Sequence, residues 1–147
     1  MSEPAAVEIR RVRPEDAEAV SELNGELGYP AGAERVRDRI HRMAKVPTQA
    51  VFVACIDGQV IGWVDVAVAL HLQSEPFALI GGLVVKDGLR GMGIGKRLCE
   101  EVELWTRAQG IHVLRVTSRS TRADAHRFYI RDGYTEVKKS CVFEKAL

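Results

Sequence analysis

Glycines and basic residues gather near the middle of the chain in a pattern suited to holding phosphate. Residues 90–96 read R-G-M-G-I-G-K, after an apolar run at 78–85 and before a segment with the apolar spacing of a helix. A helix start leaves about four backbone N–H groups without intrahelical partners, and the helix dipole adds partial positive charge. Glycines permit close backbone approach, and Arg90 and Lys96 add side-chain charge. The segment therefore predicts an anion site.

Two common phosphate motifs do not fit this turn. The dinucleotide pattern G-x-G-x-x-G fails because its third glycine position holds Lys96 in one reading and Leu98 in the other. The P-loop pattern G-x-x-x-x-G-K-[ST] fails because its first and last positions both hold arginine. A third pattern, [Q/R]-x-x-G-x-[G/A], is matched at every defined position by Arg90, Gly93 and Gly95.

With its strand before and helix after, this third pattern resembles the pyrophosphate loop of the GNAT superfamily of acetyl-CoA-dependent N-acetyltransferases. The resemblance implies that acetyl-CoA is the co-substrate. It also implies that backbone N–H groups of the preceding strand polarise the thioester carbonyl and hold the pantetheine amides. The cofactor-binding residues that it implies are Leu83, Val84, Val85, Arg90, Gly91, Met92, Gly93, Ile94, Gly95, Lys96 and Arg122. An ordinary glycine-rich strand-to-helix turn is the alternative.

A second segment carries the only other chemistry that the resemblance assigns. Residues 125–134 read A-H-R-F-Y-I-R-D-G-Y, which resembles the late A-x-x-F-Y-x-x-x-G-[FY] segment of the same superfamily. The resemblance implies that Tyr129 is the catalytic general acid, because a leaving thiolate gains from a proton. The alternative is that Phe128 and Tyr129 are both core residues of a helix.

The chain departs from the family pattern where many members carry a carboxylate and an asparagine. Gly81 and Gly82 stand in place of the carboxylate, and Arg122 in place of the asparagine. The two glycines are expected to widen the acceptor cleft. The groups that could replace the missing base are Asp65, His71, Glu75 or a chain of waters, and a polar residue at the cleft edge is the alternative for each side chain. The residues expected to line the acceptor site are Tyr29, Asp65, His71 and Gly82.

Hydrophobic periodicity predicts one α/β (α+β) domain over residues 1–147. The expected strands lie at 7–12, 50–56, 60–70, 78–85, 113–117 and 137–143, and the expected helices at about 14–28, 33–45, 94–110 and 122–132. The strand at 78–85 is expected to be buried on both faces. This order gives a mixed, partly antiparallel sheet flanked by about four helices, as the resemblance also implies. Met1 to Ala6 is expected to be a loose tail.

Composition narrows the expected partners and compartment. The 147 residues are 46% hydrophobic and 28% charged with a net charge of +1, so neither a nucleic acid nor a membrane is expected as a partner. No stretch reaches the ~20 apolar residues of a membrane span, and no signal peptide is visible. Cys55, Cys99 and Cys141 lie far apart, which predicts no metal site, no disulfide framework and a cytoplasmic protein.

The motifs and the resemblance together predict an acetyltransferase. The expected reaction moves an acetyl group from acetyl-CoA to a primary amine of a small-molecule acceptor, by direct attack on the thioester with no acyl-enzyme. The segment 121–147 is most similar to aminoalkylphosphonate N-acetyltransferases and, more distantly, to aminoglycoside 6′-N-acetyltransferases. A protein or peptide N-acetyltransferase and a non-catalytic acyl-CoA-binding module stay open. Family habit makes a homodimer an option that the sequence itself does not show.

Overall fold

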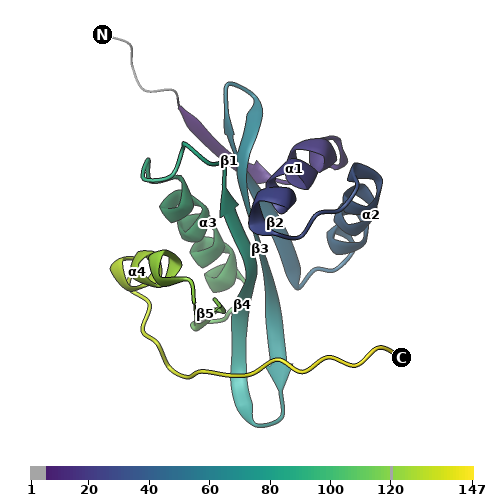
Figure 1. Ribbon diagram of the computed structural model, residues 1–147. Coiled ribbons are helices and arrows are strands. Elements are labelled where there is room, and N and C mark those ends of the chain that lie inside the picture. The colour runs from purple at the N-terminus through teal and green to yellow at the C-terminus, as the bar shows by residue number, and fades with distance from the viewer. Residues whose placement is uncertain (1–5, 120) are drawn as a thin grey trace. The chain divides into compact units, whose positions relative to one another are not determined.

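Within the residues that the structure describes, five strands form one sheet in the order β1-β2-β3-β4-β5 (Figure 1). The strands are β1 Val7–Arg11, β2 Gln49–Ile56, β3 Gln59–His71, β4 Ser74–Val85 and β5 Leu114–Val116. The first four run antiparallel to their neighbours, whereas β5 lies parallel to β4. A parallel pair needs a long crossover, and a helix supplies it here. The mixed, partly antiparallel sheet predicted from the sequence is confirmed.

The computed structural model describes residues 6–119 and 121–147, so most of the predicted N-terminal tail lies outside the described residues. The chain divides into two units, Met1–Val116 and Thr117–Leu147, and each is described by itself. Among the described residues, no helix has both the length and the apolar composition to cross a membrane.

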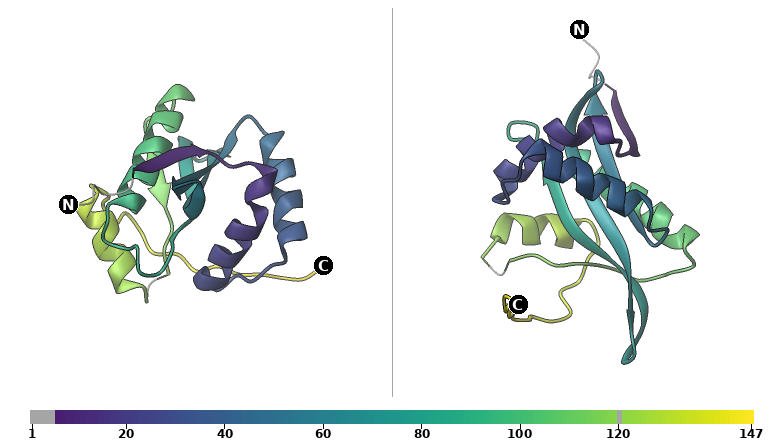
Figure 2. Two further views of the ribbon diagram at one scale, coloured as in Figure 1. Left: turned by 90° about the horizontal axis from the view of Figure 1, so that it is seen from above. Right: turned by 90° about the vertical axis from the view of Figure 1, so that its right-hand side faces the viewer.

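Helices cover both faces of the sheet in the first unit (Figures 1 and 2). A short 3-10 turn Pro14–Asp16 leads into α1 Ala17–Leu27, and α2 Ala33–Ala44 and α3 Ile94–Ala108 follow. The helices α1 and α2 lie on one face, where Leu23 and Ile40 share a core with Trp63 of β3. On the other face α3 buries the predicted stripe Ile94, Leu98, Val102 and Trp105. The strong periodicity of these helices explains why they were predictable.

Turn chemistry fixes how β2 and β3 pair. Asp57 and Gly58 connect them, and both have positive φ, 50° and 78°. A two-residue turn of this kind matches the right-handed twist of the flanking strands, so the predicted hairpin is confirmed.

The pairing of β3 with β4 contains a β-bulge. Asp65 lies opposite Gly82, whereas the next residue, Val66, lies opposite Ile80. Gly81 is therefore an extra residue on β4. The strand β4 begins earlier than predicted, at Ser74. Much of its length is only half-buried, so the expected burial of both its faces is wrong. The reason is that β4 belongs to an antiparallel hairpin rather than to the centre of a parallel sheet.

The second unit contains one helix, α4 Ala123–Arg131, within the described residues. Gly133 has a φ of 94° and closes this helix, as predicted. The predicted strand at 137–143 is wrong, because none of the described strand pairings includes this segment and its apolar side chains Val137 and Phe143 are exposed. Alternating apolar residues form a strand only when a neighbouring backbone pairs with them.

A partly buried ion pair joins β1 to the start of α1. The Arg10 guanidinium donates two hydrogen bonds to the Asp16 carboxylate, at 2.8 and 2.9 Å, and the Arg13 N–H donates a third at 2.7 Å. Asp16 is buried. Burial acts to raise the pKa of Asp16, but these bonds outweigh it and hold the pKa below its ordinary value.

We expect Arg10→Ala to lower the free energy of unfolding by about 2 kcal/mol at neutral pH, because it leaves a buried carboxylate unpaired. A depressed folded pKa contributes stability above the ordinary carboxyl pKa and loses it as pH falls through the folded value. The free energies of unfolding of the wild type and Arg10→Ala should therefore converge in acid, once the pH lies below the depressed pKa of Asp16. Urea unfolding across pH measures both effects. Arg35→Ala, on the exposed face of α2, is the control, and a difference that persists unchanged in acid would contradict this account.

Candidate active site

The predicted anion site is a loop that joins β4 to α3. Gly91 and Gly93 have φ values of 87° and 78°, a conformation that other residues rarely adopt. Gly93 is also the N-cap of α3, and no side chain caps that helix. A Cβ at either glycine would meet nothing within 4 Å. The glycines are therefore required by the turn itself, and they leave its surface open.

The start of α3 has free hydrogen-bonding capacity. The first backbone bond into the helix runs from the Arg97 N–H to the Gly93 carbonyl, at 3.1 Å. The N–H groups of residues 94–96 precede that bond, so they have no intrahelical acceptor. A helix N-terminus in this state favours an anion through its N–H groups and its dipole.

The basic side chains near this turn differ in whether they already contact other residues of the chain. Arg90 forms an ion pair with Asp87 at 3.2 Å, but both side chains are more than half exposed. An exposed ion pair of this kind contributes about 1 kcal/mol or less to stability, so Arg90 could leave Asp87 to contact a phosphate. Lys96 is exposed. Arg97 instead donates to the Val7 carbonyl at 2.6 Å and fastens α3 to β1.

An unpaired strand edge lies directly before this loop. On one side β4 pairs with β3 as far as Val85. On its other side β4 pairs with β5 only from Ala78 to Ile80. Within the described part of the first unit, the β5-facing backbone groups of residues 81–85 therefore have no strand partner. Sequence patterns did not reveal this edge, because they do not show where a neighbouring strand stops.

A carboxylate from β3 lies against the glycine pair of β4. The Gly82 N–H donates to Asp65 Oδ1 at 2.7 Å. Burial raises the pKa of Asp65 above its ordinary value, and hydrogen bonds from the Gly82 and Gly81 N–H groups offset this only in part. A Cβ at Gly81 would lie 2.8 Å from Asp65 Oδ1, and one at Gly82 would lie 2.7 Å from Cη2 of Trp63.

The glycine pair is thus explained by close packing at the bulge. Adjacent glycines within a strand are a recognisable sign of a bulge, which sequence reasoning could have used. That they widen the acceptor cleft stays a prediction. A larger side chain at Gly82 would displace Trp63. Its effect on acceptor choice alone would therefore not separate the predicted widening from this displacement.

The other predicted acceptor residues lie apart from this bulge. His71 is exposed, pairs with Ser74 at the far end of the hairpin, and stacks on Phe77 at 5.6 Å. It lies six residues beyond Asp65, about 20 Å along the strand. Tyr29 is exposed just after the end of α1. Of the predicted base candidates on these strands, Asp65 is the one that the fold brings beside the glycine pair.

The second unit holds the remaining predicted site residues. Arg122 is the N-cap of α4, and Tyr129 lies within that helix. The Tyr129 ring makes edge contacts with Phe128 at 5.4 Å and with Tyr134 at 5.6 Å. Tyr129 is half-buried, so neither the core role nor the general-acid role is excluded by its burial.

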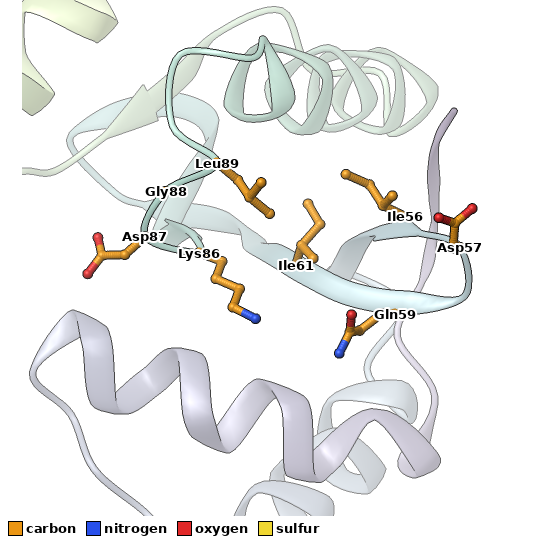
Figure 3. Close-up of a pocket in the computed structure, with 8 residues that line it drawn as sticks. All are labelled: Ile56, Asp57, Gln59, Ile61, Lys86, Asp87, Gly88 and Leu89. Carbon is orange, nitrogen blue, oxygen red and sulfur yellow. The ribbon is translucent and has the colours of Figure 1, made fainter. Parts of the chain in front are cut away.

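A shallow pocket of about 350 Å³ adjoins the loop but does not coincide with the predicted site (Figure 3). Loop residues 86–89 form one wall, and the other residues are Ile56, Asp57, Gln59 and Ile61 of the β2–β3 hairpin. None of the predicted cofactor-binding residues lines it. Across residues 6–119 and 121–147, no cluster of three or more His, Cys, Asp or Glu could hold a metal ion.

The fold and the loop together define a class of protein: a mixed α/β domain in which an unpaired strand edge precedes a helix whose N-terminus has no side-chain cap. The chain belongs to the Acetyltransferase (GNAT) family, whose sequence model matches residues 17–134. The resemblance inferred from the motifs is confirmed. Because members of this family use acetyl-CoA as co-substrate, the chain is an acetyl-CoA-dependent N-acetyltransferase.

Individual relatives agree with this assignment. An aminoalkylphosphonate N-acetyltransferase from Salmonella typhimurium is 30% identical over 135 residues, covering 88% of this chain and 85% of that protein. An aminoglycoside N(6′)-acetyltransferase type 1 from Stenotrophomonas maltophilia is 28% identical, covering 97% of this chain and 95% of that protein. The crystal structure of the aminoglycoside N-acetyltransferase AAC(6′)-Iy in complex with CoA is 18% identical and superposes with a TM-score of 0.88, covering 100% of this chain and 99% of that one.

We expect Gly82→Ala to destabilise the protein by about 1–3 kcal/mol, because its Cβ would overlap the buried Trp63 ring. Gly25→Ala is the matched control, since Gly25 lies within α1 and a Cβ there meets nothing within 4 Å. That control should stabilise by about 0.5–1 kcal/mol. Thermal and urea unfolding of both variants measure the difference, and equal stability of the two would show that the packing at the bulge is not tight.

Proposed function

We propose that this enzyme acetylates a primary amine of a small molecule, by direct attack of the amine on the acetyl-CoA thioester and without an acyl-enzyme. One observation carries the proposal: the unpaired edge of β4 is joined by a short loop, which contains Arg90, to the uncapped N-terminus of α3. An acetyl-CoA molecule whose thioester lay along this edge would have its diphosphate at the start of α3. Edge N–H groups would polarise its carbonyl.

The cofactor-binding role is proposed for two sets of residues in the first unit and one residue in the second. The strand set would act through its backbone, and the loop set through backbone N–H groups and charge. These residues are Leu83, Val84, Val85, Arg90, Gly91, Met92, Gly93, Ile94, Gly95, Lys96 and Arg122.

The proposed reaction forms one bond and breaks one. The amine nitrogen bonds to the acetyl carbon and gives up a proton to a chain of waters or to one of the predicted bases Asp65, His71 and Glu75. The carbon–sulfur bond breaks, and the leaving thiolate takes a proton, which Tyr129 is proposed to donate. Positioning supplies much of the rate. An acyl-cysteine route has little support in the first unit, because Cys55 and Cys99 are buried there and burial raises the pKa of Cys55.

The names of the relatives support the proposed substrate class. Their names specify an aminoglycoside and an aminoalkylphosphonate as acceptors, and both are small molecules with a primary amine. We extend that class to this chain and place Tyr29, Asp65, His71 and Gly82 as candidate acceptor contacts. We also propose that residues 1–147 act as one N-acetyltransferase domain. The cytoplasmic location, the homodimer and the lack of a nucleic-acid or membrane partner stay predictions.

We expect the wild type to consume acetyl-CoA with at least one amine in a panel of aminoglycosides, aminoalkylphosphonates, simple amines and peptides. Arg90→Ala should raise the KM for acetyl-CoA by about 10–100-fold, the loss expected for one charge-assisted phosphate contact. Thiol release measures the rate. Arg107→Ala is the control, because Arg107 is exposed at the far end of α3. Turnover on peptides alone would favour a protein acetyltransferase, and the absence of any turnover would contradict the proposal.

We expect Tyr129→Phe to lower kcat by about 10²–10⁴-fold, because general-acid catalysis has this typical size. Its affinity for acetyl-CoA should stay near that of the wild type, since the hydroxyl acts on the leaving group. Steady-state kinetics and calorimetric binding measure the two quantities. If both kcat and stability were unchanged, Tyr129 would not be the general acid, and solvent would protonate the thiolate instead.

A further inference from the structure

Two buried polar side chains between α1 and the sheet have no hydrogen-bond partner within the described residues. One is the indole of Trp63 on β3, at its Nε1, and the other is the amide of Asn24 on α1, at its Oδ1. Each residue is only 9% exposed. Leaving a buried polar atom unpaired lowers the stability of a protein, so native structures rarely do so. These two atoms therefore indicate a partner from outside the chain.

The side chains of Trp63 and Asn24 belong to the same helix–sheet interface. Trp63 shares a hydrophobic core with Val20 and Leu23 of α1. Asn24 follows Leu23 and lies about one helical turn after Val20, so its buried side chain points toward the sheet as theirs do. The helix α1 and the strand β3 are in contact. One small ligand in this interface could therefore reach both unpaired atoms.

The two atoms need opposite partners, which selects the kind of ligand. The indole N–H only donates a hydrogen bond, whereas the amide oxygen only accepts one. An anion beside both atoms would be disfavoured by the oxygen, and a cation by the N–H group. A water molecule accepts from the first atom and donates to the second. Buried waters in proteins typically bridge polar groups that have no other partner, and they are small enough for a packed interface.

We propose that one buried water bridges Trp63 Nε1 and Asn24 Oδ1 and ties the end of α1 to β3. The Asn24 carbonyl accepts the Tyr29 N–H at 2.9 Å, so the same residue also fixes the start of the loop after α1. At the other end of the bridge the Trp63 ring lies against Gly82, where a Cβ would be 2.7 Å from Cη2 of that ring. The water thus connects the elements that hold Tyr29 and Gly82.

Asn24 is then a positioning residue for the acceptor, a role that rests on the proposed function. Tyr29 and Gly82 are both candidate acceptor contacts, and the bridge joins the elements that hold them. The proposed cofactor contacts of the first unit belong instead to the end of β4, the loop after it and the start of α3. Loss of the bridge should therefore raise the KM for the acceptor amine and leave the affinity for CoA unchanged.

Nuclear magnetic resonance tests the bridge in the wild type without any substrate. The chain contains one asparagine and two tryptophans, so the signals of these side chains are readily assigned. We expect the Trp63 indole N–H to show cross-relaxation with a long-lived water. Asn24→Leu, which is similar in volume but has no polar side-chain atom, should remove that signal. Glu22→Gln, on the exposed side of α1, is the matched control and should retain it.

A double-mutant cycle tests whether the two side chains share one water. Asn24→Leu and Trp63→Phe should each raise the equilibrium constant for unfolding by about tenfold or more, because each leaves the opposite atom without its partner. The double variant leaves neither atom unpaired, so the two effects should fall short of additivity by about fivefold or more. The cavity made by phenylalanine is present with and without Asn24, so it cancels in the cycle. Urea unfolding gives the four constants.

Absence of the water signal in the wild type, or unfolding effects that simply add, would overturn the bridge. Coupling without a water signal would show a direct bond between the two side chains, which also overturns it. The acceptor KM of Asn24→Leu should rise by about threefold to tenfold, and an unchanged KM would overturn the positioning role. Failure of the wild type to acetylate any amine would contradict the proposed function itself, while the resonance still decides whether the bridge exists.

Discussion

The antiparallel pairing of β3 with β4 is the constraint on which the rest of the first unit depends. Through β3 the hairpin is joined to β2 and β1, and through β4 it is joined to β5 and to the loop before α3. A slip of one residue in this pairing would exchange the faces of every side chain on the strand. Trp63 would then leave the core that it shares with α1 and α2. The bulge at Gly81 achieves such an exchange locally, and it does so where the chemistry is proposed to occur.

The bulge also explains how a carboxylate from β3 comes to lie against the glycine pair of β4. In this chain the positions before Leu83 hold glycine, and the carboxylate that lies over them comes from β3. The close approach of Asp65 and Trp63 requires that no side chain be present at these positions. Fold alone does not fix an acceptor, so the choice of substrate has to be sought in the side chains around the site rather than in the sheet that supports them.

Local signals predicted most of the first unit. The apolar stripe of α3, the Asp57-Gly58 hairpin and the Arg90–Gly95 turn each depend on residues close in sequence, and the structure has all three. The bulge at Gly81 and the end of β5 pairing at Ile80 depend on distant partners, which periodicity does not show. The prediction of a strand at 137–143 was wrong for the same reason. Alternating apolar residues show which face of a strand would be buried, but not which strand would pair with it. The roles of the individual site residues remain predictions, because they concern ligands rather than folding.

The central claim is that the loop from Arg90 to Lys96 and the adjoining strand end hold coenzyme A, and backbone NMR during a CoA titration tests it most directly. Amide resonances of Gly91, Gly93 and Gly95 should shift in a saturable way, together with those of Leu83 to Val85, because N–H groups on both segments would gain acceptors. Arg90→Ala should weaken the response at the loop. If CoA bound while these amides stayed unmoved, or if it did not bind at all, the account of this site would be wrong.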